Sequence, residues 1–130
     1  MTDTQKQRPL DGIRVIEVGQ LLAGPFTGSM LGYFGAEVIK IETPGEGDPI
    51  RSWRIMKDGT SLWWSSLARN KKSVTANLRT EEGRDIVRRL AESADVVVEN
   101  FRPGTMEKWG LGPTALWEKN PGIRYQIQLQ

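Results

Sequence analysis

Short strand-like segments alternate with helical segments along most of the chain. The strand-like segments are rich in β-branched residues and lie at Ile13–Gly19, Ala36–Glu42, Ser73–Leu78, Ala94–Glu99 and Ile123–Leu129. A helix between two strands is the usual connection in a parallel sheet. The alternation therefore predicts an α/β fold with a parallel sheet and flanking helices. At 130 residues the chain is long enough for one domain.

Two of the predicted helices carry clear boundary signals. Pro25 suits the first turn of one helix, and Gly35 suits its C-terminal cap. Thr80 is an expected N-cap, because two glutamates and an amphipathic pattern follow it. Shorter helices are expected at Ser61–Arg69, Pro103–Trp109 and Pro113–Lys119. The Pro- and Gly-rich segment from Thr43 to about Thr60 is expected to be a loop.

Composition excludes several kinds of chemistry. The sequence has no cysteine and no histidine, which removes disulfides, Cys or His metal sites and His-dependent nucleophiles. Acid–base or covalent chemistry would fall to Asp, Glu, Lys, Tyr or a hydroxyl, and no metal site is expected. The 18 basic and 16 acidic residues are interleaved, whereas a nucleic-acid binder usually shows a basic stripe. No nucleic-acid partner is expected.

The sequence also gives no sign of membrane association. No apolar run approaches the roughly 18 residues of a membrane span. Residues Met1 to Leu10 are polar and lack the apolar core of a signal peptide. We expect a soluble, cytoplasmic protein without a membrane partner.

The turn after the first predicted strand is a candidate anion site. Gly19 to Pro25 leads from a strand into a helix, whose first N–H groups are free to meet an anion. The segment is not a P-loop, because Pro25 and Phe26 occupy the Lys and Ser/Thr positions, and the G-x-G-x-x-G spacing is absent. The alternative is a plain helix start with glycines for close packing, and both interpretations stay open here.

Acidic residues near the second strand allow two further interpretations. Glu42 ends that strand, where a dinucleotide-binding fold places its ribose-binding acid, so a nicotinamide or flavin protein is a rival. The alternative is a solvated acid at a strand end. Asp48 is the best acid in a loop near the site, but we do not name it as a nucleophile and assign it a structural or loop-ordering role with Arg51.

Cationic and aromatic residues flank the later strands. Lys71 and Lys72 precede the third strand, where they either meet a phosphate or are solvated. Asn100, Phe101 and Arg102 follow a valine run typical of a strand buried on both faces. An amide, an aromatic face and a guanidinium can hold a purine, and the alternative is a turn with one packed Phe. The five tryptophans, Trp109 among them, are expected mostly in the core or at a partner contact.

Six stretches in register resemble the class III CoA-transferase family, which includes CoA-transferases and α-methylacyl-CoA racemases. They are PLDGIRVIEV, LLAGPFTGSMLGYFGAEVIKIE, PGEGDPIR, NKKSV, TEEGRDIVRRL and ADVVVENFRPGTMEKWGLG. ENFRPG followed by a helix ending in GLG is the most specific of them. The resemblance implies a Rossmann-like parallel sheet, incomplete relative to the family domain, with residues 1–130 as its N-terminal CoA-binding segment.

The resemblance also implies which residues contact CoA, the expected ligand as coenzyme A or a small-molecule CoA ester. Carried over by position, the nucleotide contacts are Leu21, Leu22, Ala23, Thr43, Ala76, Asn100, Phe101 and Lys108, with Lys72 and Arg102 as nearby cations. Thr43 stands where relatives often have Arg, and Ala76 where some have a larger aliphatic residue. These two departures leave individual base contacts open.

The family's attacking aspartate has no counterpart in the sequence. In relatives, a Gly-rich segment and that aspartate follow the fifth strand, whereas IRYQIQLQ stands here at residues 123–130. We therefore expect no catalytic residue in this chain and no turnover by it alone. The resemblance implies a homodimer, since family members form interlocked dimers. A racemase-type fragment and a non-catalytic nucleotide-binding or dimerisation module remain the alternatives.

Overall fold

A computed structural model describes residues 6–127 and confirms the predicted parallel α/β fold. Five parallel strands form the main sheet in the order β5-β2-β1-β6-β7. Their bounds are β1 (Arg14–Glu17), β2 (Glu37–Glu42), β5 (Lys71–Thr75), β6 (Val96–Glu99) and β7 (Arg124–Ile127). Numbered within this sheet, the order is 3-2-1-4-5, which matches the first five strands of a common doubly wound arrangement. The strand order reverses direction between β1 and β6, and open α/β sheets bind their ligands at the carboxyl ends of the strands beside such a point.

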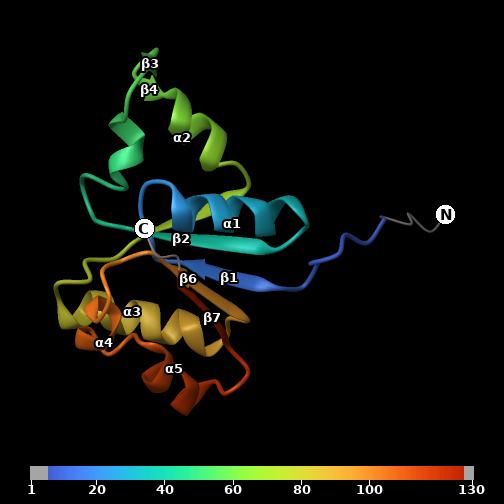
Figure 1. The fold of residues 1–130 in the computed structure, drawn as a ribbon, viewed down its shortest axis with the longest axis vertical. Helices are drawn as coiled ribbons and strands as arrows, with labels where there is room; N and C mark the ends of the chain where they lie inside the picture. The colour runs from blue at the N-terminus through green and yellow to red at the C-terminus, as the bar shows by residue number, and fades with distance from the viewer. Residues whose placement is uncertain (1–5, 128–130) are drawn as a thin grey trace.

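Helices cover both faces of the sheet (Figure 1). Helix α1 (Ala23–Tyr33) lies on one face. Helices α3 (Glu81–Glu92), α4 (Thr105–Lys108) and α5 (Pro113–Lys119) lie on the other. The Thr80 hydroxyl accepts a hydrogen bond from Gly83 N, which confirms the predicted cap of α3. The Gly35 backbone is left-handed just after α1, which confirms the expected helix end there.

The α3 face holds the larger hydrophobic core. Ile16, Ile39 and Val97 point from three central strands toward Val87 of α3 and Leu111. The core on the α1 face is smaller and consists of Val15, Ala36, Val38 and Val98, with Leu31 of α1 packed against it. The alternation of Val97 and Val98 between the two faces confirms that β6 is buried on both sides.

Strand β5 differs from its predicted span of 73–78. It begins at Lys71, pairs with β2 through Thr75, and is followed by a turn rather than further strand. The Asn77 side chain accepts a hydrogen bond from Arg79 N, an Asx turn that directs the chain out of the sheet toward α3. The predicted last strand at 123–129 is present as β7, and residues 128 and 129 lie outside the described residues.

The expected loop at 43–60 contains regular structure. It includes a 3-10 turn η1 (Pro49–Ser52) and a hairpin of β3 (Met56–Lys57) and β4 (Thr60–Ser61), followed by α2 (Leu62–Leu67). Asp58 and Gly59 make the hairpin turn with φ angles of 50° and 78°, as a primed turn requires. Figure 1 shows this extension beyond the α1 face. Within residues 6–127, no helix is long and apolar enough to cross a membrane.

Candidate nucleotide site

A pocket of about 580 Å³ opens at the carboxyl ends of β1, β2 and β5, and we call it the carboxyl-edge pocket. Among the residues predicted from the resemblance, Thr43, Ala76 and Phe101 line it. Gln20 after β1 contributes as well. This is the edge where open α/β sheets bind their ligands.

Sequence reasoning did not select several residues of this pocket. Asn77, Arg79 and Trp109 line it, and Trp109 was expected among core or partner-contact residues. The Trp109 ring meets Phe101 edge to face, with centroids 5.4 Å apart and an interplanar angle of 78°. Phe101 is half-buried and also packs on the α3-face core. The two rings thus form an aromatic wall that is anchored in the core.

The glycines of the turn after β1 allow close packing against Asn100. A Cβ atom at Gly19 would lie 2.1 Å from Asn100 Oδ1, and one at Gly24 would lie 3.0 Å from it. Asn100 is buried, and its amide exchanges two 2.8 Å hydrogen bonds with the backbone N–H and C=O of Gln20. Both polar groups of Asn100 therefore bind the turn, which supports the close-packing interpretation of the glycines.

The predicted contacts Leu21, Leu22 and Ala23 lie in this turn but do not line the carboxyl-edge pocket. Leu21 has a left-handed backbone with φ 62°, a conformation that costs an L-residue about 1–2 kcal/mol. Its N–H donates to Asp48 Oδ1 at 3.1 Å. Leu22 and Ala23 line a separate apolar hollow of about 360 Å³ with Trp63. The turn thus separates the carboxyl-edge pocket from an apolar hollow beside α2.

The Glu42 carboxylate is fully engaged within the protein. It receives Nε and Nη2 of Arg51 at 2.8 and 2.7 Å, the Ser73 hydroxyl, and the backbone N–H of Asp48 at 2.9 Å. Burial alone would raise the pKa of Glu42, but these donors outweigh it and lower the pKa to about 2. Four donors from within the protein already bind the two oxygens of this carboxylate. The structure therefore gives no support to the interpretation of Glu42 as a ribose-binding acid.

The remaining predicted cations lie in different surroundings. The Lys72 ammonium lies 2.6 Å from Glu37, at the amino end of β2 and away from the carboxyl-edge pocket. Arg102 and Lys108 are exposed, and they are the sequence neighbours of Phe101 and Trp109. None of these three lines the pocket, so the structure does not bring them together there.

Lys71 is neither solvated nor at the carboxyl edge. Its ammonium is buried, lies 2.6 Å from Glu17 Oε1 and donates to the Pro25 carbonyl of α1 at 2.7 Å. Both sequence-based alternatives for Lys71 are therefore wrong. Burial lowers the pKa of Lys71, and the nearby Glu17 carboxylate offsets this only in part.

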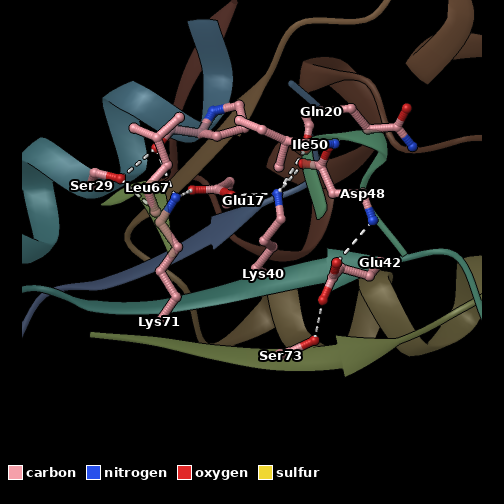
Figure 2. A network of polar contacts seen from close by, with 12 residues as sticks. Glu17, Gln20, Ser29, Lys40, Glu42, Asp48, Ile50, Leu67, Lys71 and Ser73 are labelled. Carbon is pink, nitrogen blue, oxygen red and sulfur yellow. Dashed lines mark hydrogen bonds and ion pairs between the residues drawn. The ribbon is translucent and has the colours of Figure 1, made fainter. Parts of the chain in front are cut away.

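Lys71 belongs to a buried charge cluster, defined here as Glu17, Lys40, Asp48 and Lys71 (Figure 2). Lys40 Nζ lies 2.8 Å from Glu17 Oε2 and 2.8 Å from Asp48 Oδ2. Burial would lower the pKa of Lys40, but the two carboxylates outweigh it and raise the pKa. The two cations balance the two anions, as buried charges require.

The cluster explains the role of Asp48. Its loop-ordering role is confirmed, because Oδ1 accepts from Leu21 N and from Ile50 N at 3.0 Å. The partner differs from the expected one, since Arg51 pairs with Glu42 while Asp48 pairs with Lys40. The cationic partner of Asp48 comes from within the sheet, where its charge is shielded from water.

The fold defines a doubly wound α/β protein with a pocket at the carboxyl edge of its sheet. Residues 10–126 match the model of CoA-transferase family III. The chain belongs to this family, as its motifs suggested.

Individual relatives agree with that membership. The chain is 56% identical to succinyl-CoA–D-citramalate CoA-transferase of Chloroflexus aurantiacus, across 95% of this chain and 31% of the relative. It is 52% identical to the alpha subunit of succinyl-CoA–L-malate CoA-transferase of the same organism, across 92% and 28%. A CAIB/BAIF family protein from Brucella suis superposes with a TM-score of 0.86 at 44% identity, across 94% of this chain and 33% of that protein. The chain thus spans about a third of the length of these relatives.

Proposed function

We propose that this chain is the CoA-binding N-terminal part of a class III CoA-transferase, with a Rossmann-like nucleotide-binding sheet. The observation that carries the proposal is the carboxyl-edge pocket, which Thr43, Ala76 and Phe101 line together. The Phe101 and Trp109 wall offers a face for the adenine ring. Arg79 in the pocket, with Arg102 and Lys108 exposed nearby in the chain, offers cations for phosphates.

The proposed reaction of the intact protein is transfer of CoA from an acyl-CoA to a carboxylic acid through a carboxylate acyl-enzyme. The names of the two Chloroflexus relatives support succinyl-CoA as the donor and a dicarboxylate as the acceptor. The same names favour transfer over racemisation. We assign no catalytic role to residues of this chain, whose part is to bind CoA.

Titration calorimetry of the chain with CoA, 3′-phospho-ADP and pantetheine tests the binding half of this proposal. We expect CoA and 3′-phospho-ADP to bind with affinities within about tenfold of each other, because the pocket groups suit the nucleotide. Pantetheine should bind far more weakly. Tighter binding of pantetheine would overturn the assignment, and equal binding of NAD would favour a general nucleotide-binding module.

We further propose a cytoplasmic homodimer. Exposed aromatic residues in α1 and at its C-cap support a covering partner, since Phe26, Tyr33 and Phe34 are 56%, 61% and 51% exposed. Sedimentation velocity tests this, with a mass near twice 14.6 kDa expected. A sedimenting species of the single-chain mass at every concentration would contradict it.

A further inference from the structure

The turn after β1 has a conformation that its own sequence does not favour. Leu21 is a branched residue in the left-handed region, where glycine or asparagine is usual. A conformation of this kind persists where surrounding groups over-determine it. The groups that surround this turn come from β6 on one side and from the segment after β2 on the other.

From β6, Asn100 fixes Gln20 through the two backbone hydrogen bonds described above. From the segment after β2, the Asp48 carboxylate binds the N–H of Leu21. These contacts hold two consecutive residues of the turn from opposite sides. Asp48 is 1% exposed, so water cannot substitute for it without a rearrangement.

Asp48 is in turn held by the rest of the buried charge cluster. Lys40 bridges Asp48 and Glu17, and Glu17 joins Lys71, which binds the first turn of α1 (Figure 2). A Cβ atom at Gly28 would lie 1.9 Å from Glu17 Oε1, so α1 rests directly on the cluster. The chain of contacts therefore runs from β1, β2 and β5 to the turn and to the helix that follows it.

We propose that Asp48, supported by Lys40, is a positioning residue: it holds Leu21 in its left-handed conformation, and so places the neighbouring Gln20 and sets the CoA affinity of the carboxyl-edge pocket. Asp48 acts through the backbone of the turn and does not itself contact the ligand. The proposal rests on the proposed function, in which CoA binds the carboxyl-edge pocket that Gln20, the residue before Leu21, lines. It gives Asp48, in the matched stretch PGEGDPIR, a role in CoA binding without direct contact with the ligand.

The test compares the chain with its Asp48→Asn variant, using Asp58→Asn in the exposed β3–β4 turn as the matched control. The first readout is hydrogen exchange of the Leu21 amide without any ligand. We expect exchange to quicken by about tenfold or more in Asp48→Asn, with the Val97 and Val98 amides of β6 unchanged. Unchanged exchange at Leu21 would overturn the proposal, whether or not the chain binds CoA.

The second readout is CoA affinity, measured where both variants are fully folded by circular dichroism. Asp48→Asn should weaken CoA by about tenfold, and Asp58→Asn by less than about twofold. CoA affinity is also measured with and without Asp48→Asn in a Leu21→Gly background. This comparison separates an effect of Asp48 on the conformation of Leu21 from a general loss of stability. Because glycine adopts the left-handed region without strain, Asp48→Asn should cost less than about threefold there.

The outcomes separate the two proposals. Failure of the unaltered chain to bind CoA would contradict the proposed function, while amide exchange at Leu21 still decides the role of Asp48. Quickened exchange with unchanged CoA affinity would overturn the positioning role alone. Asp48→Asn could also weaken CoA equally in the unaltered chain and in the Leu21→Gly background. That result would show that Asp48 acts on the ligand or on stability, and not through the turn.

Discussion

The two faces of the sheet are packed by different chemistry. Toward α3, β1 presents Ile16 to an aliphatic core, whereas toward α1 it presents Glu17 to two lysines. Helix α3 buries Val87 and Ala91 in that core, and α1 approaches the sheet through Gly28 and Ser29. The comparison indicates that the α3 face supplies most of the hydrophobic stability. The α1 face uses charge and close backbone approach to order the turn beside the site.

Lys40→Met gives the sharpest test of the charged face. The change leaves Glu17 and Asp48 buried with only Lys71 to balance them. Removing one partner of a buried ion pair typically costs about 3–5 kcal/mol, so we expect a loss of that size in the free energy of unfolding. Urea unfolding measures it, with exposed Lys57→Met as the control. A loss no larger than that of the control would show that the cluster is not essential for stability.

The pH dependence of stability tests the contribution of Glu42, which also lies on the α1 face. Its folded pKa of about 2 lies below the ordinary 4.5, so its stabilisation is present above about pH 4.5 and is lost as pH falls toward 2. Arg51 is 41% exposed, and after allowance for solvent screening we expect about 2 kcal/mol from this carboxylate.

Urea unfolding of the chain and of Glu42→Gln between pH 7 and pH 3 measures this contribution. The gap between the two free energies of unfolding should narrow as the pH falls. A gap that stays constant across this range would contradict the lowered pKa of Glu42.

Phe101→Ala tests whether Phe101, which packs on the α3-face core and lines the carboxyl-edge pocket, serves mainly CoA binding or stability. Losing a stacking face should weaken CoA by about 1–3 kcal/mol, by analogy with aromatic platforms for nucleic-acid bases. Because Phe101 is only half-buried, the loss of stability should stay below the roughly 3–5 kcal/mol of a fully buried Phe. CoA affinity and the urea midpoint are measured on the same variant. A large fall in midpoint with intact affinity would make Phe101 a core residue only.

Ile16→Val is the smallest of these changes and affects the aliphatic face alone. Removing one methylene from this fully buried side chain should cost about 0.5–1.5 kcal/mol of stability. We expect CoA affinity to stay unchanged, since Ile16 points away from the turn. Calorimetry with CoA checks this, and a clear loss of affinity would show that the two faces do not have separate roles.

The order of strands and helices was predictable because each segment carries its own periodicity. Thr80 at the start of α3 and the buried β6 valines followed from local rules of capping and burial. The hairpin at 56–61 was missed although Asp58 and Gly59 are a strong turn signal. The flanking strands are only two residues long and have no alternating pattern to support that signal.

The buried charge cluster was not predictable from strand patterns. Glu17 and Lys40 each alternate with aliphatic residues, which is the pattern of a strand with one solvated face. Their burial depends on partners from three separate segments, and a single strand holds no information about them. The same limit applies to Asn100, whose amide binds a turn 80 residues earlier in the chain.

The most direct test of the central claim is NMR shift mapping of the chain with 3′-phospho-ADP. We expect the largest changes at the backbone amides of Gln20, Thr43, Ala76 and Phe101, around the carboxyl-edge pocket. Amides of Arg14 and Glu37, at the opposite edge of the sheet, should stay unchanged. Changes centred on Arg14 and Glu37, or none at a concentration that saturates CoA binding, would contradict the assignment of the carboxyl-edge pocket to the nucleotide.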